Sequence, residues 1–278
     1  MGSLAGQTIL MSGGSRGIGL AIALRAARDG ANVAMIAKTD QPNPKLPGTI
    51  HDAAQQITEA GGRALAIVGD VRSDDSVTEA VERTREECGG IDIVINNASA
   101  IDLSTTSALS MKRYDLMQDI NCRGTFLLAK SALSDLRRSA QANRHPHILT
   151  LSPPINLSPH WVGAHLGYTI AKYGMSLTTI GLAEELRTDG IQVHSLWPRT
   201  TIATAAIINM DGGAAMAARA RTPEIMADAA HAVLTGDAAF PSGGFLIDDD
   251  VLASIGVTDF GAYRCTPGEG DLQSDIFL

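Results

Sequence analysis

Cysteines, aromatic residues and basic residues are all scarce in this sequence. Its 278 residues contain three cysteines, an odd number at distant positions, which excludes a disulfide framework and favours a reducing compartment. Aromatic side chains make up only 4%, few for the stacking surfaces that bind single-stranded nucleic acid. With 22 Lys and Arg against 30 Asp and Glu, the net charge of −8 argues against binding to nucleic acid or to an anionic membrane.

Long hydrophobic runs are also missing. No apolar stretch reaches the ~18 residues of a membrane span, and the first residues lack the apolar segment of a signal peptide. We therefore expect a cytoplasmic protein without an integral membrane segment. The 45% of apolar residues, together with 28 Gly, indicate instead a globular chain whose helices pack tightly on a sheet.

Short apolar runs alternate with helical patterns along the chain. The runs cover residues 8–11, 32–37, 64–68, 91–95, 147–151, 191–197 and 245–247. Because apolar and polar residues do not alternate within them, we expect parallel strands that are buried on both faces. They predict an α/β fold, a single Rossmann-type doubly wound parallel sheet of about seven strands with helices on both faces. No linker or repeat divides residues 1–278, which we interpret as one domain.

Other segments carry more specific expectations. Helical patterns predict one long helix over residues 110–139 and another over about 164–187. Residues 38–48 contain Pro42, Pro44 and Pro47 and should form an irregular loop, because proline cannot donate a backbone hydrogen bond. From about Asp248 we expect an irregular tail, with the acidic residues 248–250 in solvent.

A glycine-rich loop follows the first strand. Gly13, Gly17 and Gly19 lie between a strand and a helix, which is the context that a phosphate-binding loop needs. Gly13 permits the turn, Gly17 lets the backbone approach a phosphate, and Gly19 lets the helix pack on the strand. The neighbouring Ser15, Arg16 and Ile18 lie at the helix N-terminus, whose free N–H groups favour a pyrophosphate.

The end of the second strand bears on the choice of cofactor. An NAD site usually has an acidic residue there, which binds the ribose 2′-hydroxyl. This strand ends in Ala37 and Lys38, and Asp40 follows only within the loop. Lys38 and Arg16 carry charges that suit a 2′-phosphate, although both are also compatible with ordinary surface cations. We therefore expect NADP(H) as the preferred cofactor, with NAD(H) as the alternative.

Tyr168 and Lys172 lie four residues apart in a predicted helix. This spacing places the phenol and the ammonium on one face. A free tyrosine titrates near ~10, and a neighbouring cation lowers that value by stabilising the phenolate. The pair therefore predicts a general acid/base site at neutral pH.

Several motifs together resemble the short-chain dehydrogenase/reductase family. They occur in the family's order from about Gly6 to the last strand, and they are residues 12–19, Asp70-Val71, residues 96–99, Asn121 and Tyr168-x-x-x-Lys172. Residues 37–45, 151–156 and 196–200 resemble one longer member of that family, which carries a C-terminal sterol-carrier domain.

The resemblance implies roles for individual residues. Tyr168 would be the general acid/base, Lys172 would hold the nicotinamide ribose and tune Tyr168, and Asn121 would anchor a water relay to Lys172. It also implies cofactor contacts, at the adenine from Asp70 and Val71, along the cofactor from Asn97 and Ala98, and beside the nicotinamide from Pro198 and Thr200. Arg199 stands where the family usually has glycine.

One element of the family pattern is displaced. The family's catalytic serine usually lies about thirteen residues before the tyrosine, a step that falls here on Ile155. Alignment on the strand end gives Pro153 instead, with Ser152 just before it. Two interpretations of Ser152 remain. It replaces the family's serine as the catalytic donor to the substrate oxygen, or it only satisfies a hydrogen bond at the strand end.

The sequence leads to one principal hypothesis and two alternatives. The principal hypothesis is an NADP(H)-dependent oxidoreductase that interconverts a carbonyl and a secondary alcohol. Its small-molecule substrate would be lipid-like or acyl, covered by the Ala-rich segment after Thr200. The alternatives are an NADP-binding sensor or scaffold with vestigial catalysis, and an enoyl-type reductase. The histidines near the fifth strand have no metal-binding spacing, so we expect no metal.

We also expect a homo-oligomer, either a tetramer or a dimer. In the family, the helices that correspond to residues 110–139 and 164–187 pack against symmetry mates. Their apolar residues are too many for a solvated surface. The candidates are Leu127, Leu128, Leu133, Leu177 and Ile180.

Overall fold

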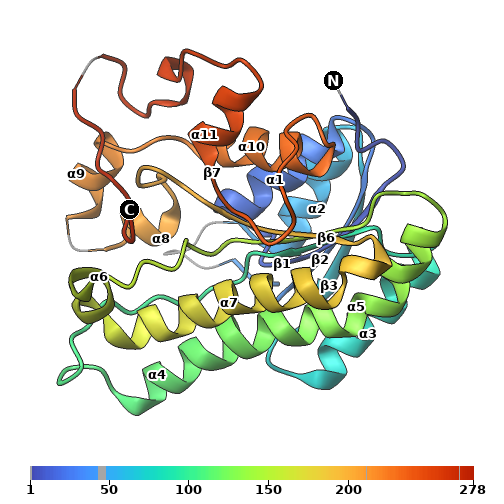
Figure 1. The fold of residues 1–278 in the computed structure, drawn as a ribbon, viewed down its shortest axis with the longest axis horizontal. Coiled ribbons are helices and arrows are strands. Elements are labelled where there is room, and N and C mark those ends of the chain that lie inside the picture. Colours follow the sequence, from blue (N-terminus) through green and yellow to red (C-terminus); the bar gives the residue numbers. More distant parts are fainter. Residues whose placement is uncertain (1, 43–47, 211, 269) are drawn as a thin grey trace.

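The computed structural model shows a parallel sheet between two layers of helices (Figure 1). The structure describes residues 2–42, 48–210, 212–268 and 270–278. The strands run in the order β3-β2-β1-β4-β5-β6-β7 and every neighbouring pair is parallel. They are β1 (Thr8–Ser12), β2 (Asn32–Ala37), β3 (Arg63–Val68), β4 (Ile93–Asn96), β5 (His147–Thr150), β6 (Gln192–Trp197) and β7 (Phe245–Ile247). The predicted doubly wound fold is confirmed.

Helices cover both faces of the sheet (Figure 1). On one face lie α1 (Gly17–Ala27), α2 (Ile50–Glu59), α10 (Glu224–Leu234) and α11 (Asp248–Ser254). On the other lie α3 (Asp74–Cys88), α5 (Gly124–Gln141) and α7 (Leu166–Glu185). The central strands β1, β4 and β5 are buried along their whole length, whereas the edge strand β3 exposes Arg63 and Val68.

The long helix predicted over residues 110–139 consists of three parts. The Ser110 hydroxyl caps α4 (Met111–Met117) by accepting a hydrogen bond from Arg113 N. A π-helical segment (Gln118–Arg123) follows and continues into α5. The helix predicted over residues 164–187 is α7, preceded by the short α6 (Pro159–Ala164).

The segment from Asp248 differs from the prediction of an irregular, solvated tail. It begins with α11, where acidic residues in the first turn stabilise the positive end of the helix dipole. The Asp248 side chain is fully buried and accepts hydrogen bonds from Arg199 N and Asp249 N. The prediction failed because the partner of Asp248 lies far away in the sequence.

Two further segments bear on the sequence predictions. Of the loop predicted over residues 38–48, positions 38–42, with Pro42, contain no helix or strand; positions 43–47, with Pro44, lie outside the described residues. The Ala-rich segment after Thr200 contains the short helices α8 (Ala205–Ile208) and α9 (Gly213–Ala218).

Candidate active site

The site lies where β1 and β4 are neighbours at the centre of the sheet. From β1 the chain continues outward to β2 on one side, while β4 continues to β5 on the other. Such a switch point opens a crevice at the carboxyl ends of the strands. Here those ends are Ser12 and Asn96, which are paired in the register.

The glycine-rich loop leads from β1 into an uncapped helix. Gly13 has φ 73°, and a Cβ there would lie 2.9 Å from Ala98 Cα. Arg16 occupies the N-cap position of α1 without a side-chain cap, and the first turn contains no acidic residue. The free N–H groups of this turn therefore remain available to an anion, which fits the pyrophosphate of a dinucleotide.

Asn97 holds this loop in place. Its side-chain nitrogen donates to Gly13 O at 2.7 Å. A Cβ added at Gly19 would lie only 2.5 Å from the same nitrogen. The backbone N–H groups of Asn97 and Ala98 donate to the hydroxyl of Ser12 at 3.2 and 3.1 Å. A side chain at position 19 would therefore collide with Asn97 and with Gly13 O.

A cleft of about 430 Å³ extends from this loop across the ends of β2 and β3. Most of the sequence-predicted cofactor residues line it, namely Gly13, Ser15, Arg16, Gly17, Ile18, Lys38, Asp70, Val71, Asn97 and Ala98. The structure therefore brings together residues from the ends of four strands. This is the region where the sequence predicted the adenosine and pyrophosphate.

The two cations predicted to favour a 2′-phosphate both have partners. Lys38 Nζ lies 3.0 Å from Asp70 Oδ2, and its side chain is 59% exposed. Arg72 also pairs with Asp70, and these interactions, with Arg72 the larger contribution, hold the pKa of Asp70 well below its usual range. Arg16 donates to Gly48 O at 2.9 Å, and burial lowers its pKa.

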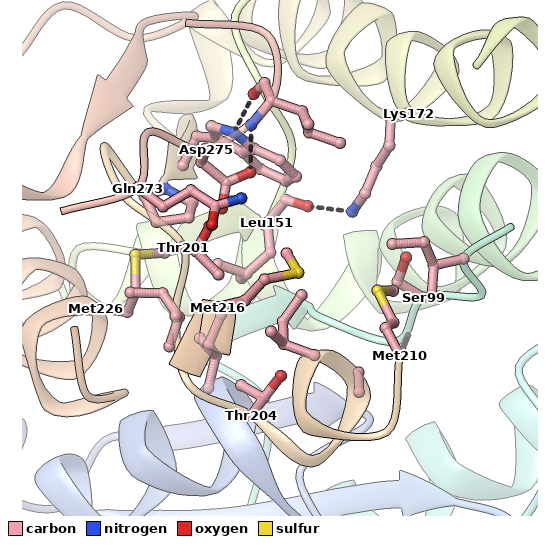
Figure 2. Close-up of a pocket in the computed structure, with 18 of the residues that line it drawn as sticks. Ser99, Leu151, Lys172, Thr201, Thr204, Met210, Met216, Met226, Gln273 and Asp275 are labelled. Atoms are coloured by element: carbon pink, nitrogen blue, oxygen red, sulfur yellow. Dashed lines mark hydrogen bonds between the residues drawn. The ribbon is translucent and has the colours of Figure 1, made fainter. Parts of the chain in front are cut away.

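A second, smaller pocket of about 240 Å³ adjoins the cleft. The two share Ile18, Asn97, Ser99, Thr204 and Ala206 as lining residues. The predicted pair Tyr168 and Lys172 lines the pocket from α7, and apolar side chains make up most of the remaining wall. Figure 2 shows three of these, Met210, Met216 and Met226.

Lys172 is held in a low-dielectric environment. Its side chain is 3% exposed, and Nζ donates to Leu151 O at 2.8 Å, as Figure 2 shows. The ammonium also lies 5.1 Å from the centre of the Trp197 ring. Burial lowers the pKa of Lys172 to about 7, while Asp275, when ionised, acts in the opposite direction.

Tyr168 is equally buried, with 4% of its surface exposed. Burial raises its pKa above the ordinary value, and so does Asp275, whereas a hydrogen bond with Ser99 acts in the opposite direction. The sequence predicted that Lys172 would lower this pKa. That prediction is wrong for the structure described here, because burial outweighs the other influences on the phenol.

Asn121 is fully buried within the π-helical segment. Its amide accepts from Ala100 N at 2.7 Å and donates to Ala100 O at 3.0 Å. Asn121 thereby fixes the backbone that follows β4, beside Ser99 in the pocket. Its role in a water relay to Lys172 stays a prediction.

Ser152 points into the interior of the protein. Its hydroxyl oxygen lies 2.8 Å from that of Ser195, which in turn lies 2.8 Å from Thr179 Oγ1. Ser152 is fully buried and is not among the described residues that line the pocket. Of the two interpretations that the sequence left open, this geometry favours the structural one.

Some of the residues that follow β6 line the pocket, and others lie behind its wall. Pro198 lines the pocket, whereas Thr200 is 6% exposed and its hydroxyl has no hydrogen-bonding partner among the described residues. Thr201, which the sequence analysis did not select, lines the pocket. Arg199 forms ion pairs with Asp249 and Asp250 of α11 at 2.8 and 2.6 Å.

A segment far along the chain also enters the site. We call residues 273–278 the strap. It is hydrogen-bonded to the loop that follows β6: Thr201 N donates to Gln273 O at 2.9 Å, and Asp275 N donates to Arg199 O at 3.0 Å. Phe277 is 2% exposed and contacts the rings of Tyr168 and Trp197. Asp275 lines the pocket opposite Lys172 (Figure 2). No local pattern marked these residues.

Within the described residues, no group of three or more His, Cys, Asp or Glu side chains is arranged to hold a metal. The helices in the same part of the chain are too short or too polar to cross a membrane.

Comparison with known proteins agrees with the predicted resemblance. A family model described as short chain dehydrogenase matches residues 7–211. Hydroxysteroid dehydrogenase-like protein 2 of Danio rerio is 51% identical over 277 residues, and that of Homo sapiens is 47% identical. Both matches cover 100% of this chain but only 65% and 64% of those relatives. A solved short chain dehydrogenase structure from Mycobacterium thermoresistibile has a TM-score of 0.91 at 52% identity, covering 99% of this chain and 96% of that one.

Proposed function

The chain belongs to the short-chain dehydrogenase family, and on that premise we propose that it is an NADP(H)-dependent oxidoreductase. It interconverts a carbonyl and a secondary alcohol, with Tyr168 as the general acid/base. The observation that supports this most strongly is the Tyr168–Lys172 pair in an apolar pocket that shares its lining with the cleft beside the glycine-rich loop.

The residues of the chain hold and orient the reactants. The N–H groups at the start of α1 bind the pyrophosphate, and the carboxyl end of β4 lines the cofactor's path. When bound, the dinucleotide supplies or accepts the hydride at the carbon of the substrate. Tyr168 donates its proton to the substrate oxygen in reduction and takes it back in oxidation. A phenol with a raised pKa is protonated at neutral pH, which suits donation.

Support for NADP(H) comes from the end of β2. Ala37, Lys38 and Thr39 line the cleft, so a 2′-phosphate at this point would meet a cation and not a carboxylate of β2. The pair between Lys38 and Asp70 is compatible with this proposal, because an exposed ion pair contributes little and exchanges readily.

The pocket wall supports a lipid-like or acyl substrate. Ile101, Leu103, Ile202 and the three methionines supply an apolar surface in which flexible thioether side chains adapt to irregular shapes. Polar lining groups concentrate near Tyr168 and on the strap. A molecule with one oxygen function and an apolar body fits this distribution.

The placement of Ser152 favours one alternative, an enoyl-type reductase, in which hydride goes to a C=C bond and a serine donor matters less.

We also propose a homo-oligomer, because α5 and α7 expose Phe126, Leu177 and Ile180 with 52%, 59% and 43% of their surfaces accessible. Leu128, by contrast, is buried in the core.

A turnover assay tests the proposed function. Purified protein is given NADPH with a panel of medium- and long-chain ketones and matched enoyl thioesters, and oxidation of the cofactor is followed. Ketone reduction that Tyr168→Phe abolishes supports the proposal. Reduction of enoyl substrates alone favours the alternative, and NADPH binding without turnover of any substrate favours a sensor or scaffold.

A further inference from the structure

Asp275 is a carboxyl group within the pocket that the proposed chemistry does not yet use. It lies on the strap, and its backbone N–H donates to Arg199 O at 3.0 Å. One carboxyl oxygen, Oδ1, accepts from Ile276 N at 2.7 Å. Among the described residues, the second oxygen has no hydrogen-bonding partner. This oxygen is therefore free to interact with a molecule in the pocket.

The strap fixes Asp275 in position. On one side Gln273 pairs with Thr201, and on the other the indole of Trp197 donates to Ile276 O at 3.1 Å. Phe277 then anchors the segment among aromatic rings. A hydrogen-bonding group that is held from both sides keeps its orientation, so it does not have to be reoriented when the substrate reacts.

Ser152, the candidate replacement for the family's serine, does not supply a donor to the pocket, which Ser99, Thr201 and Ser274 line with hydroxyl groups. The hydroxyl of Ser152 is engaged by Ser195 in the interior. Lys172 Nζ donates to Leu151 O. Carbonyl reduction nevertheless benefits from a second hydrogen-bond donor, because negative charge develops on the oxygen before the proton from Tyr168 arrives.

We propose that Asp275, as a neutral carboxylic acid, is the second hydrogen-bond donor to the substrate oxygen and takes the place of the family's serine. This assignment rests on the proposed carbonyl chemistry. Asp275 transfers no proton in the step. It donates a hydrogen bond, while the proton that forms the alcohol comes from Tyr168.

The surroundings of Asp275 favour its neutral form. From α7 it faces Tyr168 and Lys172, and from the N-terminus of α11 it faces the buried carboxyl of Asp248. Arg199, whose carbonyl accepts from Asp275 N, forms its ion pairs with Asp249 and Asp250, and Arg221 forms its ion pair with Asp249. Burial, joined by the repulsion from Asp248, raises the pKa of Asp275 to about 7, although Lys172 and the Ile276 N–H act against it.

The test compares Asp275→Asn and Asp275→Ala with the wild type. The amide still donates a hydrogen bond, so the Asn variant should keep at least about a tenth of the wild-type kcat. The Ala variant should lose on the order of a hundredfold, as expected for a single lost oxyanion donor. NADPH affinity, measured by fluorescence titration, should be unchanged in both and reports that both are folded. Asp271→Asn, the same change at an exposed site before the strap, is the matched control.

The pH dependence separates a donor from an anion that supports Lys172. The wild type loses its donor as Asp275 ionises above about pH 7, whereas an amide does not ionise. The ratio of Asn-variant to wild-type rates should therefore rise between pH 6 and 9. If Asp275 served Lys172 as an anion, both variants would be equally impaired, NADPH would bind more weakly, and the ratio would fall with pH.

The outcomes also distinguish the two proposals. An active wild type with Asp275→Ala within about threefold of it overturns the assignment and leaves the proposed function standing. So do Asn and Ala variants with equal losses. A wild type that reduces no carbonyl overturns the proposed function and this assignment together.

Discussion

The hydroxyl oxygens of Ser152 and Ser195 lie 2.8 Å apart in the interior, at the start of a chain that continues to Thr179. Because this chain engages Ser152 away from the pocket, we expect Ser152→Ala to reduce turnover by less than about tenfold. Loss of one buried hydrogen bond should reduce the free energy of unfolding by about 1 kcal/mol. Steady-state kinetics and chemical denaturation measure the two effects. A hundredfold loss of rate with unchanged NADPH affinity would show that Ser152 is the donor after all.

Substitutions of Tyr168 and Lys172 should have different effects on turnover and on cofactor affinity. Tyr168→Phe removes the proton donor from a buried site and should abolish turnover while cofactor affinity stays nearly constant. Lys172→Ala should reduce both, since the ammonium is predicted to hold the ribose as well as to influence Tyr168. Isothermal titration with NADPH and an activity assay give the comparison. Measurable turnover in Tyr168→Phe would contradict the assignment of the general acid.

Lys38→Asp should change the preference between the two nicotinamide dinucleotides. A charge-assisted contact to a 2′-phosphate contributes roughly 1.5–3 kcal/mol, so NADPH binding should weaken about ten- to a hundredfold while NADH binding changes little. Lys112→Asp introduces the same charge at an exposed position of α4 and serves as the control. Equal affinity of the wild type for both cofactors would refute the preference.

His147 and His194 form a buried pair at the other end of β5 and β6, with Nε2 and Nδ1 2.9 Å apart. Burial lowers the pKa of both, that of His147 to about 3 with His194 contributing. The unfolded chain binds these protons near the ordinary value of ~6.5. The stabilising contribution is therefore complete above about pH 6.5 and is lost as the pH falls toward 3.

Denaturation of wild type and His147→Asn at several pH values measures this contribution. The stability difference between them should shrink by up to about 1.4 kcal/mol for each pH unit below 6. Activity at pH 7 should be unaffected, because the pair lies away from the pocket. A difference that is constant from pH 7 to 5 would contradict the inference.

Leu177→Lys should dissociate the proposed oligomer. Its side chain is 59% exposed on α7, so the substitution creates no buried charge in the folded chain but places one in the expected interface. Sedimentation at micromolar concentration should change from an oligomer to a monomer. Ile255→Lys, at an exposed site after α11, should leave the assembly intact. A wild type that sediments only as a monomer would refute the proposal.

Local patterns accounted for most of the cofactor cleft. Gly13 could be selected because a turn with positive φ must follow β1, and Tyr168 with Lys172 because four residues make one helical turn. The direction of Ser152 could not be predicted in this way, since its partner Ser195 lies on the neighbouring strand. Arg199 was noticed as unusual, but its partners on α11 could not be predicted while that helix was expected to be an irregular tail.

The sequence alone determined the succession of strands and helices, the glycine-rich turn, and the Tyr168–Lys172 pair on one helix face. Each of these depends on backbone geometry and on spacings within a few residues. Only the tertiary structure decided which polar groups meet in the pocket. Asp275 approaches Lys172 because the strap pairs with the loop after β6 and Phe277 packs among the rings of α6, α7 and β6. Contacts of this kind arise from packing between distant segments, and the protonation of the groups follows from the burial that this packing creates.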